Sequence, residues 1–307
     1  MPPSTRPAAH AEPTRRGLLR GALGLGTLGF AALTGCATPP EAPSGPQASP
    51  TPAAPPTQNP AASPSATPPA AAAVMTRAEA VAKYRGRKPG QFGLDVPGIQ
   101  LGLPRGSKAA ALSFDACGGP GGTSFDRALI KALRDADAPA TLFVNQRWAR
   151  ANRSLLADLS ADPLFEIANH GTSHAPLGVA GQEAYGIPGT ASVGQAYDEI
   201  MGNQRYLAGE FGLGARFFRS GTAHMDQIGA ELCRDLGLVP MNFTVNLDAG
   251  ATFAASVVEA QVGGLRAGDV GIGHFNRPDS GTAAGVRKGL KTLQDAGVEL
   301  VRLSQAW

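Results

Sequence analysis

The feature that most constrains this chain is an alternation of short apolar segments with amphipathic ones from Lys108 onward. Strands are expected at Ala109–Phe114, Thr141–Asn145, Phe165–Asn169, Arg216–Arg219, Val239–Val245, Asp269–His274 and Glu299–Leu303. Helices are expected over Phe125–Asp135, Ser154–Ser160, Val193–Phe211, Asp226–Leu236, Ser256–Leu265 and Gly281–Ala296. This alternation predicts a parallel α/β fold, and both a (β/α) barrel and an open doubly wound sheet fit it.

Chemically reactive side chains follow the ends of several expected strands. They are Asp115, His170, His174, Arg219, His224, Asp248 and His274. In both architectures the working face lies at the carboxyl ends of the strands, so these residues are expected to share one site. The pair His170 and His174 can direct two imidazole nitrogens at one divalent ion. Taken alone, the pair also fits a hydrogen-bonded surface turn.

Six of these positions lie in five motifs that resemble those of a known family. The motifs are Ser113-Phe114-Asp115, His170-Gly-Thr-Ser-His174, Arg219-Ser-Gly, Asp248 and Ile272-Gly273-His274, in that order. They resemble polysaccharide deacetylases of carbohydrate esterase family 4, over nearly all of the segment from Lys108 to Leu303. The resemblance implies a deformed (β/α)7-type barrel that hydrolyses an N-acetyl or O-acetyl group on a sugar polymer.

The resemblance also implies roles for individual residues, and these roles agree with the chemistry. Amide hydrolysis needs an activated water, a stabilised oxyanion and a proton for the leaving amine. Asp115 is expected to act as the base and His274 as the acid. Arg219 would keep Asp115 ionised, and Asp248 would keep His274 protonated.

The expected cofactor is a divalent metal, with zinc as the expected ion, bound by His170 and His174. The usual family pattern has a second aspartate after the first, and here that position is Ala116. The chain is similar to a subgroup whose first motif reads Asp-Ala-Cys-Gly-Gly. The third ligand therefore stays open: Asp115 is a tentative candidate, and another group, a weakly held ion or metal-free hydrolysis are alternatives. His224 is a spare candidate ligand, with a groove or structural role favoured.

Residues 1–35 resemble a twin-arginine and lipoprotein signal peptide. Arg15 and Arg16 precede a short apolar stretch, and Leu33-Thr34-Gly35-Cys36 matches a lipobox. Cleavage before Cys36 would give an exported, extracytoplasmic lipoprotein anchored in a bacterial membrane through Cys36. A signal peptide cut elsewhere is the alternative.

Residues 36–90 are expected to form a disordered linker, and residues 91–307 the catalytic domain. The part from Pro39 to Ala73 contains 12 prolines and no aromatic residue, so it has too little apolar surface to fold. A short helix is expected at Thr76–Tyr84. Four arginines and one glutamate of the leader account for the whole net charge of +3. The remainder is neutral, which argues against nucleic acid as a partner.

Two cysteines remain besides the lipidated one, Cys117 and Cys233. Export permits a disulfide, but the sequence does not establish whether they pair, and a nucleophilic Cys117 is disfavoured. Trp148 and Tyr185 are expected either to stack on sugar rings or to pack. Two other functions stay open beside the deacetylase: an amidohydrolase with a small substrate, and an inert glycan-binding lipoprotein, which Ala116 would explain.

Overall fold

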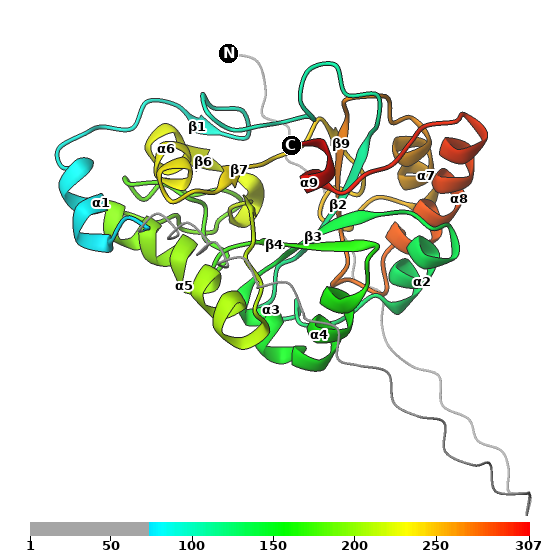
Figure 1. Ribbon diagram of the computed structural model, residues 1–307, viewed down its shortest axis with the longest axis horizontal. Helices are drawn as coiled ribbons and strands as arrows, with labels where there is room; N and C mark the ends of the chain where they lie inside the picture. Colours follow the sequence, from blue (N-terminus) through cyan, green and yellow to red (C-terminus); the bar gives the residue numbers. More distant parts are fainter. Residues whose placement is uncertain (1–73) are drawn as a thin grey trace, which may run out of the picture. The chain divides into compact units, whose positions relative to one another are not determined.

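The computed structural model describes residues 74–307 (Figure 1). The predictions for the signal peptide, for Cys36 and for the proline-rich stretch up to residue 73 lie outside the described residues. The site discussed below lies entirely within the described part of the chain.

A sheet of seven parallel strands forms the centre of the fold, as the alternation predicts. Its strands are β2 (Ala111–Ala116), β3 (Ala140–Val144), β4 (Phe165–Asn169), β5 (Phe217–Phe218), β7 (Val239–Pro240), β8 (Val245–Asn246) and β9 (Val270–His274). Their spatial order is β7-β5-β4-β3-β2-β9-β8. The long central strands β2 and β3 are buried along their whole length, which is typical of a parallel sheet covered by helices.

The sheet is curled into a deformed barrel. Strands β7 and β8 are its two opposite edges, yet only residues 241–244 lie between them in the chain. The five peptide steps from Pro240 to Val245 reach at most about 18 Å when fully extended. Because a flat sheet of seven strands is wider than this, the two edges must approach each other. The open doubly wound alternative is therefore excluded.

Two strands differ from the sequence prediction. The single strand expected over Val239–Val245 is divided into β7 and β8, because Met241 and Asn242 turn their carbonyl groups toward the side chain of Arg219. The strand expected over Glu299–Leu303 is reduced to one isolated bridge between Ala110 and Leu300. The chain then enters the short helix α9 (Leu303–Ala306).

All six predicted helices are present. They are α2 (Arg127–Asp135), α4 (Arg153–Ala161), α5 (Val193–Phe211), α6 (Gln227–Asp235), α7 (Ala255–Gly263) and α8 (Thr282–Asp295). Helix α3 (Gln146–Ala151), which the sequence pattern did not predict, begins at Asn145, whose side chain caps it. Helices α2, α8 and α7 lie together on one side of the sheet, with α5 and α6 on another (Figure 1). No helix within residues 74–307 is long and apolar enough to cross a membrane.

The folded part begins before residue 91, the boundary expected from the sequence. The helix expected at Thr76–Tyr84 is present as α1 (Arg77–Lys83), with Thr76 capping its first turn. It packs against α5, where Arg77 pairs with Asp198 at 3.0 Å. The buried Tyr84 donates its hydroxyl hydrogen to Asp235 on α6. Residues 76–84 therefore belong to the domain rather than to the linker.

Strand β2 has one face in the apolar core and the other face toward the polar site. Leu112, Phe114 and Ala116 point outward into the main core cluster, which the helices cover. Ser113 and Asp115 alternate with them and are buried as polar residues on the inner face. The inside of the curled sheet is thus apolar at one end and polar at the carboxyl ends of the strands.

Candidate active site

Reactive residues from the ends of three strands line one cavity of about 430 Å³. Asp115 and Cys117 come from β2 and the residue that follows it, His174 from the loop after β4, and His274 from the end of β9. Asp115 and His274 are register partners on the adjacent parallel strands β2 and β9. The expectation that these polar residues meet at the carboxyl ends of the strands therefore agrees with the geometry.

Asp115 is held by a fully buried arginine. Arg219 Nη1 donates to Asp115 Oδ1 at 2.7 Å, and Nη2 donates to Ser113 Oγ at 2.9 Å. The remaining donors of Arg219 reach Met241 O at 3.1 Å and Asn242 O at 2.8 Å, between β7 and β8. Its guanidinium also lies 4.0 Å from the centre of the Phe143 ring. The arginine is thus fixed by groups from both sides of the curled sheet.

The charges in this cluster favour an ionised Asp115. Burial by itself would raise the pKa of the Asp115 carboxyl, but the Arg219 guanidinium and the neighbouring imidazoles outweigh it and hold that pKa below its usual range. Arg219 is not among the residues that line the cavity. It therefore acts on the site through Asp115.

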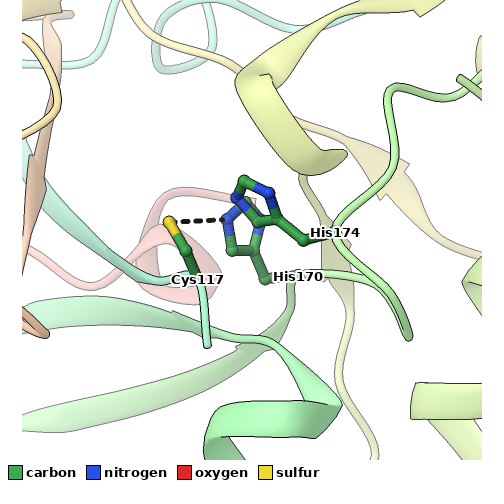
Figure 2. A group of neighbouring side chains, drawn as sticks. All are labelled: Cys117, His170 and His174. Atoms are coloured by element: carbon green, nitrogen blue, oxygen red, sulfur yellow. Dashed lines mark hydrogen bonds between the residues drawn. The ribbon is translucent and has the colours of Figure 1, made fainter. Parts of the chain in front are cut away.

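His170 presents one nitrogen to the site. Its Nδ1 lies 2.9 Å from the carbonyl oxygen of Arg219, and because a carbonyl only accepts, Nδ1 carries a proton and Nε2 is the nitrogen that faces the site. Nε2 lies 3.5 Å from Asp115 Oδ2 and 3.9 Å from Cys117 Sγ. The His170 and His174 rings lie edge to face, with centroids 4.8 Å apart (Figure 2).

A buried carboxylate on α5 shapes the loop that carries His174. Glu199 accepts hydrogen bonds from the backbone N–H groups of Ser173 and Ala175 and from the Ser173 hydroxyl. Gly171 has a φ of 78°, and a Cβ at this position would lie 2.4 Å from Glu199 Oε1. His174 itself has a φ of 67°, a conformation that needs such support in a non-glycine residue. Sequence analysis missed Glu199 because it lies in an otherwise ordinary helix.

The loop is also held from its other side. A Cβ on Gly221, the glycine of the Arg-Ser-Gly motif, would lie 2.0 Å from the carbonyl oxygen of His174. Asn145 donates through Nδ2 to the carbonyl oxygens of His170 and Gly171, at 2.9 and 2.8 Å. The backbone of the histidine motif is therefore fixed before any ligand binds.

His274 forms a second, separate charge pair. Its Nδ1 donates to Asp248 Oδ1 at 2.9 Å, and its backbone N–H donates to Asp248 Oδ2 at 2.7 Å. Thr282 donates a further hydrogen bond to Asp248 Oδ2. Burial alone would lower the pKa of His274, but Asp248 and Cys117 outweigh it and hold the pKa well above its usual range. These charges favour the protonated ring, and the bond from Nδ1 to Asp248 orients it so that Nε2 faces the site.

The residues present fit a metal ion. Among residues 74–307, one set of three potential ligands has all its donor atoms within 4.8 Å of one another, namely Cys117, His170 and His174 (Figure 2). Imidazole nitrogen and thiolate sulfur are the donors that zinc prefers. Burial by itself would raise the pKa of the Cys117 thiol, but His170, His174 and His274 outweigh it and lower that pKa well below its usual value.

Several other sequence candidates lie outside this cluster. His224 is stacked between Phe92 and Tyr185, at centroid distances of 5.6 and 5.4 Å. Its Nδ1 bonds to the carbonyl oxygen of Thr222, which agrees with a groove or structural role. Trp148 is fully buried and packs in the core, whereas Tyr185 is 79% exposed beside the cavity.

The two cysteines of the folded domain lie in different environments and are not paired with each other. Cys117 and Cys233 are both free, so they form no disulfide with each other. Cys233 lies on α6 and is buried in a core cluster. Cys117 lies in the cavity beside the histidines, a position that the sequence analysis did not assign to it. The signal that points there is strand alternation, because Cys117 comes two residues after the inward-facing Asp115.

Comparison with known proteins places this fold. Residues 102–241 match the family model described as polysaccharide deacetylase. This range contains Asp115, His170, His174 and Arg219 but ends before Asp248 and His274. A search of curated proteins gave no significant match.

Three solved structures illustrate the similarity. A carbohydrate esterase family 4 pseudoenzyme from Bacillus anthracis matches with a TM-score of 0.58 and 16% identity, over 69% of each chain. A family 4 carbohydrate esterase from Streptomyces lividans, in complex with acetate, matches with a TM-score of 0.51 and 24% identity, over 64% of this chain and 92% of that one. The peptidoglycan deacetylase PdaC from Bacillus subtilis matches with a TM-score of 0.52 and 20% identity, over 66% and 90%. At these identities the matches establish a shared fold.

Proposed function

We propose that this chain removes N-acetyl or O-acetyl groups from a cell-envelope polysaccharide, in keeping with the match of residues 102–241 to the polysaccharide deacetylase family model. One observation carries the proposal. A carboxylate and an imidazole, Asp115 and His274, lie opposite each other on adjacent strands, and each has its own buried partner of opposite charge. A base and an acid held in this way beside one cavity are what hydrolysis of an acyl group requires.

Asp115 is the proposed base. Its Oδ1 is occupied by Arg219, whereas Oδ2 has no partner closer than His170, 3.5 Å away. Oδ2 is therefore the atom that would take the proton from the attacking water. Because Arg219 stabilises the ionised carboxylate, Asp115 is in its proton-accepting form at neutral pH.

His274 is the proposed acid. The bond from Nδ1 to Asp248 fixes the ring and favours the imidazolium form. Nε2 would then donate its proton to the departing amine nitrogen, or to the alcohol oxygen if the acyl group is an ester. Asp248 does not line the cavity and is proposed as a positioning residue.

His170 and His174 are proposed to hold a divalent metal, zinc being the expected ion. A bound metal would polarise the acyl carbonyl and lower the pKa of a water molecule. The orientation of His170, whose Nδ1 is engaged by the Arg219 carbonyl so that Nε2 faces the site, and the fixed loop around His174 support this assignment. Asp115, the other candidate ligand, has one carboxylate oxygen bound to Arg219.

The substrate and the location follow from the family and from the leader sequence. The cavity of about 430 Å³ has the size of a small-molecule site, and Tyr185 beside it offers an exposed ring on which a sugar can stack. We propose that the chain is exported, anchored through a lipid on Cys36, and held at a distance by the linker. The inert-binding alternative gives no reason for a buried Arg219–Asp115 pair beside a protonated His274.

Acetate release tests this function. Purified protein is incubated with an N-acetylated chitooligosaccharide, with N-acetylated peptidoglycan and with an O-acetylated glycan, before and after chelation. We expect acetate from at least one polymer, and a loss of about 10²- to 10⁴-fold in Asp115→Asn and in His274→Ala. Circular dichroism confirms that both variants fold. Unchanged turnover in either variant would refute the assigned roles, and turnover of small amides alone would favour the amidohydrolase.

A further inference from the structure

We propose that Cys117 is the third protein ligand of the metal, so that Asp115 stays free to act as the base. This inference rests on the proposed metal-assisted hydrolysis and concerns the position left open by Ala116. It assigns this chain a Cys-His-His site where the family pattern uses one aspartate and two histidines.

The direction of the side chains on β2 explains why residue 117, rather than residue 116, supplies the ligand. Ala116 is fully buried and belongs to the outward-facing core cluster, together with Leu112 and Phe114. Asp115 and Cys117 line the cavity, as expected for positions two residues apart in extended backbone. A carboxylate at position 116 with this side-chain direction would enter the apolar core. The absence of a second aspartate therefore leaves the ligand set intact.

The distances between the donor atoms fit a tetrahedral metal. Ligand bonds of about 2.3 Å to sulfur and 2.0–2.1 Å to nitrogen place neighbouring ligand atoms about 3.3–3.6 Å apart. Cys117 Sγ lies 3.9 Å from His170 Nε2, and all three donor atoms lie within 4.8 Å of one another. Small side-chain rotations would close the cluster around an ion. Figure 2 shows the sulfur and the two rings converging on the same space.

The backbone around Cys117 is constrained as a ligand position should be. Gly118 has a φ of 66°, and its N–H donates to Gly122 O in a tight turn. A Cβ on Gly118 would lie 2.6 Å from the backbone nitrogen of Trp148. This close approach holds the end of β2 against α3, and Arg147 donates a further hydrogen bond to the carbonyl oxygen of Cys117. The backbone of Cys117 is thus fixed, and this fixed backbone positions Sγ in the cavity.

Asp115 is less well placed to be the ligand. One of its oxygens is bound by Arg219 at 2.7 Å, and the carboxylate is not part of the cluster of three mutually close donors. Among residues 74–307, Asp115 is the one carboxylate that lines the cavity, so binding it to the metal would remove the group that is proposed to accept the proton. With Cys117 as the ligand, both requirements are met by different residues.

A thiolate ligand has a spectroscopic consequence that separates it from a carboxylate. Cobalt(II) replaces zinc in such sites, and a cobalt–thiolate bond gives an intense near-ultraviolet charge-transfer absorption that nitrogen and oxygen ligands do not. Thiolate also favours zinc and cobalt over magnesium and manganese. Both properties can be measured without substrate.

The test uses the full chain, stripped with a chelator and titrated with cobalt(II) alone. The wild-type protein is expected to bind one cobalt with the charge-transfer band. Cys117→Ser is expected to lose the band and more than about 100-fold in affinity, because even changes to groups around a ligand cost about 10–100-fold. Cys233→Ala is the matched control and is expected to keep both. Asp115→Asn is expected to keep both as well, although it removes the base.

Cys117→Asp guards against a variant that merely fails to fold. It is expected to bind metal without the band and to shift preference toward manganese(II). A band that persists in Cys117→Ser, or metal loss in Asp115→Asn with retention in Cys117→Ser, would overturn the inference. If the wild-type protein binds no cobalt, the inference is also wrong. Acetate release from the same preparation then decides separately whether the hydrolase assignment stands.

Discussion

The floor and the rim of the cavity are built in different ways. The floor is here Asp115, which lines the cavity, together with two buried charged residues behind the cavity wall, Arg219, which bonds to Asp115, and Asp248, which bonds to His274. The rim is here Tyr185, which lines the cavity and is 79% exposed, together with His224, whose ring meets that of Tyr185 edge to face. The floor thus belongs to the core of the fold, whereas the rim belongs to its surface.

This difference separates chemistry from recognition. A change in the floor removes a buried charge or leaves its partner unpaired, so it affects folding and turnover together. A change in the rim removes exposed area and is expected to affect only the binding of substrate. Substitutions in the floor are therefore expected to lower stability or turnover strongly, and substitutions in the rim to change KM alone.

The largest effect is expected for Arg219→Met. Removing one partner of a buried ion pair leaves Asp115 charged and unpaired, which costs about 3–5 kcal/mol in the free energy of unfolding. Urea denaturation measures this loss, and acetate release is expected to disappear. Adding Asp115→Asn to Arg219→Met is expected to restore part of the stability but none of the activity. Equal stability of the wild-type protein and Arg219→Met would contradict the claim that the floor residues stabilise the fold.

A smaller effect is expected for Asp248→Asn, and it takes the form of a changed pH profile. Asp248 raises the pKa of His274. The other titratable groups near His274 on the neighbouring segment are Asp115 and Cys117, which line the same cavity. Because an acid works only while protonated, activity is lost as pH rises through the pKa of His274. Asp248→Asn is expected to move this loss to lower pH and to reduce kcat by about 10²-fold at neutral pH. An unshifted basic limb would assign the acid to another group.

Glu199→Gln is expected to weaken the metal site while leaving the acid and the base in place. Glu199 fixes the loop of His174 through backbone N–H groups and makes no contact with the proposed ligand atoms. We expect a loss of about 10- to 100-fold in zinc affinity, measured by competition with a chelator. Excess zinc is expected to restore turnover. Glu210→Gln, on the exposed face of the same helix, is the control and should have no effect.

The smallest effect is expected at the rim. Tyr185→Ala is expected to raise KM for a polymeric substrate about 2- to 10-fold, the equivalent of an aromatic contact of about 0.5–1.5 kcal/mol. Neither kcat nor the urea midpoint should change, and Tyr185→Phe should behave as wild type. If stability falls as well, Tyr185 belongs to the floor by this criterion, and the division between the two regions is not valid.

The sequence predicted the parts of the molecule that follow from local pattern. The alternation of strand-like and helix-like hydrophobic patterns predicted the parallel strands and six helices. The expected strand ends predicted the positions of Asp115, His170 and His274. The break between β7 and β8 was missed because the apolar run Val239–Val245 reads as one strand. Pro240 within this run indicates a strand end, since proline is rare inside a central strand.

Other parts of the site depend on contacts between distant segments and leave no local signal. Glu199 lies on α5, 25 residues after His174 along the chain, and only the fold shows that its carboxylate binds the loop backbone. Cys117 is a different case. Strand alternation alone places the Cys117 side chain on the same face as Asp115. The family pattern, however, puts the ligand at position 116, so the sequence motif pointed to the wrong residue.

Arg219 connects the two edges of the curled sheet with the catalytic carboxylate. Its guanidinium bonds to carbonyl oxygens on the link between β7 and β8 and, at the same time, to Asp115 on β2. One side chain therefore connects the closed edges of the barrel with the proposed base. Under the proposed function, a chain in which β7 and β8 have not yet come together would lack the Arg219 contacts that orient Asp115, and it would leave the surrounding glycan intact.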